Sequence, residues 1–180
     1  MPLPSALDHI RDSRLRRFTE YWLGRRRGRL VPCRADIDVT DVPWILPWIW
    51  LMQYFPDSDR FLCRVAGDNV NAFLCCNIGG HYIGGHFMDE YLPSQALAEL
   101  SDRYRAVLRD RVIMHASGLF TTQSYHADGE RVAFPLSEDG TTVDLVIGAS
   151  LYGSRPPDGE SLVDDSTVPR YTPLADLPGS

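Results

Sequence analysis

The sequence predicts an α+β fold, and three observations lead to that prediction. Two short segments near the start of the chain and three longer ones near its end alternate apolar and polar residues, which is typical of an antiparallel sheet. Between these groups lie a short segment and a longer segment of helical period. A further amphipathic helix stands in front. The expected order is therefore a helix, two strands, two helices and three strands.

The leading element is an amphipathic helix from Leu7 to Leu23. Its apolar residues fall on one stripe and arginines fill the opposite face. The stripe must pack either on the body of the domain or on the same helix of a second copy. Because aromatic side chains dominate protein contacts, we expect a homodimer interface made by Leu15, Phe18, Tyr21 and Trp22.

The next elements are a β-hairpin and two helices. Residues 49–55 and 60–66 alternate as paired strands do, with the turn-forming residues Pro56 to Asp59 between them. Asp68 is placed to cap a short helix, and Ser94 is placed to cap a longer one with a single apolar stripe.

The last third predicts an antiparallel meander of three strands over residues 112–122, 123–136 and 142–152. Two Asp-Gly pairs, Asp128-Gly129 and Asp139-Gly140, have the chemistry of hairpin turns. From residue 154 onward the chain is rich in Pro, Gly, Ser and Asp, and this composition favours a disordered or loosely docked tail over residues 154–180.

Composition limits the function classes. A chain of 180 residues with 44% hydrophobic residues can bury the core of one domain. The net charge of −6 disfavours nucleic acid as a partner, although the first 34 residues hold nine arginines against three acidic residues. The most apolar window is interrupted by prolines and is too short to span a membrane. With no secretory signal visible, the expected compartment is the cytoplasm.

Five stretches in the expected order resemble the PAS domain, and more specifically the alphaproteobacterial single-domain PAS_5 family. They are LRRFTEYWL (15–23), PCRADIDVTD with PWIL (32–46), RFLCRVAG (60–67), DEYLP (89–93) and PLSEDGTTVDLVIG (135–148). The resemblance covers roughly residues 13–153. It implies a five-stranded antiparallel sheet with helices on one face, used for small-molecule sensing or protein association and not for catalysis.

The resemblance divides the chain into an N-terminal amphipathic helix with a basic link (1–30), a PAS domain (31–153) and the tail (154–180). It also implies a ligand cavity between the long helix and the sheet. The residues expected to line this cavity come from both helices, the link between them and the meander. They are Phe73, Tyr82, His86, Met88, Tyr104, Val107, Met114, Phe134 and Ile147.

The link between the two helices departs from the family pattern. The segment DNVNAFLCCNIGGHYIGGHFM, which contains NIGGHYIGGH (77–86), is a few residues longer than in relatives and carries cysteine and histidine where they carry arginine. Haem held by His86 or His81 is one alternative, because some PAS domains hold haem near this position. A zinc site is disfavoured because Cys75 and Cys76 are adjacent and cannot readily direct both sulfurs at one ion.

The same link offers thiols beside a histidine, but the sequence around them matches no nucleophile motif. Buried cysteine acting as a small apolar residue is the simpler interpretation. We therefore predict a non-enzymatic sensor or adaptor that binds a small molecule, a signalling protein or both. The alternatives are a haem- or metal-binding sensor and a ligand-free interaction or dimerisation module.

Overall fold

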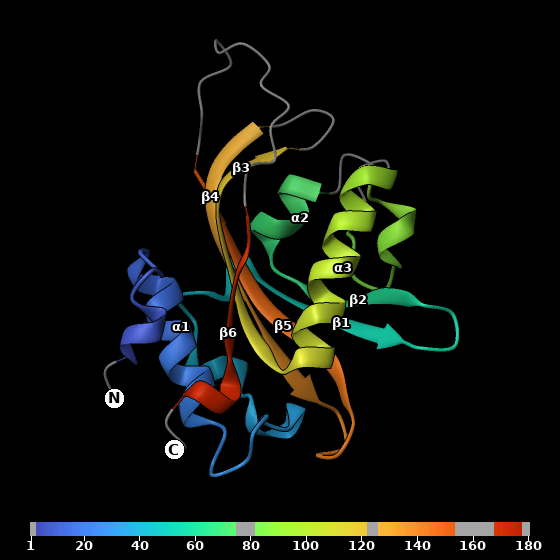
Figure 1. The fold of residues 1–180 in the computed structure, drawn as a ribbon. Helices are drawn as coiled ribbons and strands as arrows, with labels where there is room; N and C mark the ends of the chain where they lie inside the picture. The colour runs from blue at the N-terminus through green and yellow to red at the C-terminus, as the bar shows by residue number, and fades with distance from the viewer. Residues whose placement is uncertain (1–2, 75–81, 122–125, 154–167, 178–180) are drawn as a thin grey trace.

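The computed structural model describes residues 3–74, 82–121, 126–153 and 168–177, which form an α+β fold around one antiparallel sheet (Figure 1). Its six strands lie in the order β2-β1-β5-β4-β3-β6. The strands are β1 (Ile49–Phe55), β2 (Arg60–Ala66), β3 (Val112–Thr121), β4 (His126–Ser137), β5 (Val143–Tyr152) and β6 (Arg170–Pro173). The predicted α+β class and antiparallel sheet are confirmed.

In the described residues, three α-helices accompany the sheet. They are α1 (Ser13–Gly24), α2 (Asp68–Leu74) and α3 (Ser94–Asp110). Short 3-10 turns lie before, between and after these elements: η1 (Ser5–Leu7), η2 (Arg34–Asp36), η3 (Val39–Asp41), η4 (Leu46–Trp48), η6 (Met88–Glu90) and η7 (Leu174–Asp176). Within the described segments, no helix combines the length and the apolar character needed to cross a membrane.

The sheet separates two hydrophobic layers. In Figure 1, α2 and α3 lie on one side of it and α1 on the other. Successive strand residues point to opposite faces, so Trp50 packs in the α3 layer while Leu51 packs in the α1 layer. The expected helices on one face are therefore α2 and α3, and the N-terminal helix covers the opposite face.

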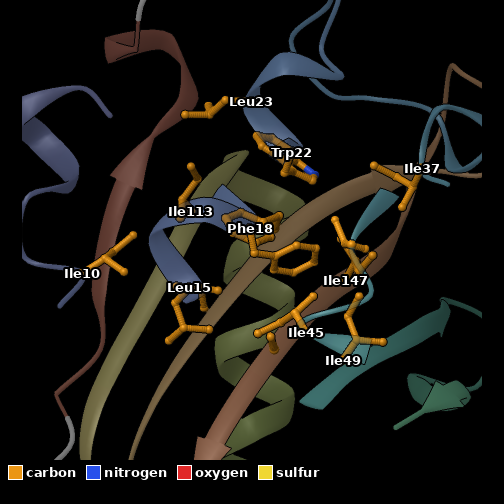
Figure 2. Close-up of a cluster of buried hydrophobic side chains, with 14 of the residues drawn as sticks. Ile10, Leu15, Phe18, Trp22, Leu23, Ile37, Ile45, Ile49, Ile113 and Ile147 are labelled. Atoms are coloured by element: carbon orange, nitrogen blue, oxygen red, sulfur yellow. The ribbon is translucent and has the colours of Figure 1, made fainter. Parts of the chain in front are cut away.

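The apolar stripe of α1 is buried inside its own chain. Phe18 and Trp22 are fully buried and lie in the cluster of side chains shown in Figure 2. Both rings contact Phe134 of β4, with centroid separations of 5.5 and 5.1 Å. Leu15 is also fully buried. The half-buried Tyr21 donates its hydroxyl to the Asp38 carbonyl at 2.9 Å. The stripe therefore covers the sheet. Because its side chains are buried there, they are not available to form the predicted homodimer interface with a second copy.

The sixth strand comes from the region expected to be a tail. Strand β6 pairs antiparallel with β3, with Thr172 opposite Ile113. Leu174 and Leu177 follow it and are buried in the α1 layer. The prediction of five strands is therefore wrong by one, and residues 170–177 belong to the domain. Residues 154–167 of the predicted tail lie outside the described residues.

One of the two predicted turns is wrong. Asp128 and Gly129 lie within β4, where Asp128 pairs with Leu119 and Gly129 pairs with Gly118 on one side and Tyr152 on the other. The pairing on both sides of the strand outweighs the local turn preference of Asp-Gly. The second turn, at Asp139-Gly140, is confirmed: Gly140 has a φ of +84°, and the Asp139 carboxylate accepts the Thr141 and Thr142 amides at 2.8 and 2.7 Å.

A carboxylate on β4 anchors the entry to α1. Glu130 accepts the backbone amides of Arg11 and Asp12 at 2.7 and 2.8 Å, and Asp12 in turn caps α1 by accepting the Arg14 amide. Nε2 of the buried His115 lies 2.7 Å from the same carboxylate. The His9 ring packs against the His115 ring with centroids 4.8 Å apart. The start of the chain is therefore attached to the sheet through this polar cluster.

This cluster predicts a loss of stability in mild acid that depends on His9. Burial, followed by the nearby His115 and Arg170, lowers the pKa of His9 from its ordinary 6.5, against weaker opposing effects of the Ala6 carbonyl and Glu130. As the pH falls below 6.5, the unfolded chain binds a proton at His9 before the folded chain does, so the free energy of unfolding decreases. In urea titrations from pH 7.5 to 5.5, His9→Gln should lose less stability than the wild type. An equal loss in both proteins would contradict this assignment.

Candidate functional site

A small cavity lies between α3 and the sheet. Its volume is about 30 Å³, room for about two water molecules. Most of its wall is apolar or aromatic and is supplied by the sheet, α3 and the segment before α3. These wall residues include Trp50, Met52, Met88, Tyr91, Leu100 and Tyr104.

One side of the cavity is polar. Arg131 on β4 donates from Nε to the Ser150 hydroxyl at 2.7 Å and from a terminal nitrogen to the Tyr152 hydroxyl at 3.3 Å. The Trp50 indole N–H donates to the same Ser150 oxygen at 2.9 Å. Arg131 is 7% exposed and Ser150 is fully buried. Because Arg131 pairs with Ser150 across the two central strands, the sheet register itself fixes this polar group.

Gly148 sets the position of the Trp50 ring. These residues face each other across β1 and β5, and a β-carbon at Gly148 would come within 2.3 Å of the indole ring and 2.4 Å of the Val132 carbonyl oxygen. Only glycine therefore leaves room for the indole, whose ring centroid lies 5.0 Å from that of Tyr104. The tryptophan fills space that would otherwise belong to the cavity.

The segment entering α3 is docked on the edge of the sheet. The Cys63 amide of β2 donates to the His86 carbonyl at 2.9 Å, and the Gly85 amide donates to the Cys63 carbonyl at 2.7 Å. Asn71 of α2 accepts the buried Ile83 amide at 3.0 Å and donates to the Ala66 carbonyl at 2.8 Å. This part of the glycine-rich link thus closes the β2 edge and ties α2 to it.

The sequence matches the model of the PAS_5 family, described as a PAS domain, over residues 10–151. The match covers most of the chain and includes α1, α2, α3 and the described cavity wall up to Ser150; the lining residue Tyr152 lies just beyond it. The chain belongs to the PAS domain family. No curated protein and no solved structure matches it. Membership supports a signalling sensor or interaction module in general, a class of domain that is generally not enzymatic.

Four of the residues predicted to line the PAS cavity lie in the α3 layer, where the cavity is. Met88 and Tyr104 form part of the cavity wall. Val107 and Met114 are fully buried in the same α3 layer, where they pack the core next to it. The apolar stripe of the long helix therefore faces the side of the sheet on which the cavity lies.

Four other residues that were predicted to line the cavity do not lie in its wall. Phe134 and Ile147 point to the opposite face of the sheet and pack under α1. Tyr82 is 68% exposed. Phe73 is buried but stacks on Tyr152, with ring centroids 3.9 Å apart, and does not line the cavity. The error for Phe134 and Ile147 follows from parity: on β4 and β5 the cavity side is taken by the alternate positions.

The polar residues of the PAS cavity were missed, although their sequence carries a signal. Leu145, Ile147, Ala149 and Leu151 form the apolar face of β5, so the positions between them face the other layer. Those positions include Ser150 and Tyr152, which line the cavity. A serine and a tyrosine on the inner face of a buried strand, opposite an arginine, indicate a polar site.

His86 is not placed to hold haem in the PAS cavity. Its Nδ1 lies 2.8 Å from the Glu90 carboxylate at the surface, and its side chain is 41% exposed. This contact lowers the pKa of the Glu90 carboxyl. His86 is not among the described residues that line the cavity, and a cavity of about 30 Å³ has no room for a porphyrin. The other predicted ligand, His81, lies outside the described residues.

The described segments of the PAS domain hold no cluster of metal-binding side chains, and Cys63 is not a reactive thiol. These segments contain no group of three or more His, Cys, Asp or Glu side chains able to hold a metal ion, and Cys75 and Cys76 are not among them. The described Cys63 is fully buried, and burial raises the pKa of its thiol to about 12, so it remains protonated and is a poor nucleophile. The described wall of the cavity offers hydrogen-bonding groups and apolar surface.

Proposed function

We propose that this PAS domain is a non-enzymatic sensor or adaptor of cytoplasmic signal transduction, in which a small molecule between α3 and the sheet alters association with a signalling protein. The supporting observation is the buried polar cluster of Arg131, Ser150 and Trp50. Burying an arginine is costly, and apolar replacements of buried polar groups are often neutral or stabilising. A role in recognition explains why the core contains this cluster.

Filling the cavity provides the test. Leu100 of α3 lines it, so Leu100→Trp should occupy the space with an indole. Arg109→Trp, at a side chain 73% exposed on the same helix, serves as the matched control. Native mass spectrometry of gently purified protein should find a bound small molecule on the wild type and on Arg109→Trp but not on Leu100→Trp. A bare chain mass for all three proteins would contradict small-molecule binding.

The size of the cavity favours a second candidate, a ligand-free interaction module. Trp50 and Tyr104 already fill most of the space between α3 and the sheet, leaving about 30 Å³. In this case the output is association alone, with a signalling protein or a second copy of the chain. The contacting surface would lie elsewhere than the buried stripe of α1. For a ligand-free module, native mass spectrometry should find only the bare chain mass, the same result that would contradict small-molecule binding.

A further inference from the structure

A surface groove lies where the β1–β2 hairpin meets α3 (Figure 1). Its volume is about 280 Å³, close to the lower end of the range of about 300–1,000 Å³ found for small-molecule sites. Phe61 of β2 and Leu97 and Ala98 of α3 supply its apolar surface. None of the described residues that line this groove also lines the cavity beside Arg131, so the two spaces are separate.

The charged groups of the groove are already paired with one another. Arg60 donates from Nε and a terminal nitrogen to the two oxygens of Asp89 at 3.0 and 2.8 Å. Arg105 donates in the same way to Asp59, with both bonds at 2.9 Å. The bonds from the arginines hold the pKa values of the Asp59 and Asp89 carboxyls below their ordinary value, so both pairs stay ionised at neutral pH. A charged ligand would have to break a bidentate pair, and the groove therefore suits an uncharged one.

The flat faces of these guanidinium groups remain for stacking. A guanidinium that is bonded through its edge still presents its face to an aromatic ring. Arg60 shows this arrangement, because its Cζ lies 3.7 Å from the centroid of the Phe87 ring while its edge is bonded to Asp89. No described aromatic ring stacks on Arg105, whose side chain is 32% exposed. An aromatic ring in the groove can therefore stack on Arg105.

A buried hydroxyl lies next to this arginine. Ser101 lines the groove four residues before Arg105, so the two side chains are neighbours on one face of α3. Ser101 is 7% exposed, and its hydroxyl makes no hydrogen bond to any described residue. A buried polar group without a partner costs free energy, which a ligand that supplies the partner recovers. Because a serine hydroxyl both donates and accepts, it can bond to a ligand hydroxyl in either direction.

We propose that this groove binds an uncharged, single-ring phenol, with its ring stacked on the Arg105 guanidinium and its hydroxyl bonded to Ser101. The size is suitable, because a cavity of about 150 Å³ suffices for benzene and the groove offers about 280 Å³. This site is a second one, and it does not rest on the small molecule proposed for the cavity.

The test compares phenol with toluene and cyclohexanol. Toluene has the shape of phenol without its hydroxyl, and cyclohexanol has the hydroxyl without the aromatic ring. In ¹H–¹⁵N spectra of the full chain, phenol should saturably shift the backbone amide signals of Leu97, Ala98 and Ser101. Cyclohexanol should bind about two- to fivefold more weakly than phenol, because it cannot stack on the guanidinium. Ser101→Ala should weaken phenol binding by at least about threefold and should not weaken toluene binding, because only phenol loses a hydrogen bond.

Two pairs of variants locate the site. Ala98→Trp places an indole in the groove and should abolish phenol binding, whereas Gln95→Trp, at an exposed position of α3 outside the groove, should not. Leu100→Trp, which fills the separate cavity, should also leave phenol binding intact. Phenol binding that is lost in Leu100→Trp but kept in Ala98→Trp would overturn the assignment to the groove.

Three other results would overturn the inference. They are the absence of saturable phenol binding, an unchanged phenol affinity in Ser101→Ala, and cyclohexanol binding as tight as that of phenol. The comparison of phenol with cyclohexanol needs only the wild-type protein. None of these results decides the proposed function of the cavity, whose own test is native mass spectrometry.

Discussion

Trp22→Ala should lower the free energy of unfolding by about 3–5 kcal/mol, the range expected when a large aromatic side chain is removed from a packed core. Trp22 is fully buried, and its ring stacks on Phe134 at 5.1 Å with an interplanar angle of 16°. Its removal leaves a cavity between α1 and the sheet that the rigid sheet cannot close. Urea unfolding monitored by circular dichroism measures the loss.

Trp22→Phe is the matched control. The Trp22 indole N–H is buried and finds no hydrogen-bond partner among the described residues, so its removal forfeits no described hydrogen bond. The phenyl ring keeps most of the contact with Phe134, and the expected loss is therefore much smaller than for alanine. Equal losses for the two variants would show that α1 does not depend on this stacking.

The burial of this stripe also determines the expected effect of charged substitutions in α1. If the stripe formed a dimer interface, Phe18→Glu with Trp22→Glu would yield a folded monomer. Because both side chains are fully buried within one chain, we expect this double variant to unfold, since an uncompensated buried charge costs several kcal/mol. A folded protein with a sedimentation mass lower than that of the wild type would contradict this expectation and support a dimer interface at α1.

The local sequence pattern was sufficient to predict an element where the residues that decide its bounds are close together in the chain. The bounds of β1 and β2 were predicted correctly because each strand alternates cleanly and the turn between them is rich in Pro, Asp and Ser. The start of α3 at Ser94 was predicted from its capping chemistry, although Pro93 occupies the cap and Ser94 is the first helical residue. In these cases the information lies within a few neighbouring residues.

The pairing of strands that are far apart in the sequence could not be predicted from local patterns. Strand β6 has four residues and ends at Pro173, so its own sequence hardly indicates a strand, and β3 supplies its partner from more than fifty residues away. Asp128-Gly129 has the chemistry of a turn but is paired on both sides within β4. The polar side of the cavity depends on the register that brings Arg131 opposite Ser150, and no single segment reveals that register.

Gly148→Ala should destabilise the fold near the upper end of the range of about 1–3 kcal/mol found for overpacked cores. The added β-carbon would lie 2.3 Å from the Trp50 ring and 2.4 Å from the Val132 carbonyl oxygen. Rotation of the indole can relieve the first contact, but the second involves the backbone of the neighbouring strand and cannot be relieved in the same way. Both urea unfolding and the indole N–H signal of Trp50 in ¹H–¹⁵N spectra should therefore report the change.

Gly24→Ala is the control, because a β-carbon there meets no atom within 4 Å. At the end of α1 it should leave stability unchanged or raise it by about 0.4–1 kcal/mol through the unfolded chain. Wild-type stability of Gly148→Ala would mean that β4 and β5 can separate locally without cost. Since that register also carries Ser150 and its bonds to Trp50 and Arg131, Gly148→Ala should disturb the polar side of the cavity even where the protein remains folded. The glycine thus connects the packing of the sheet to the polar side of the cavity, and a single substitution probes both.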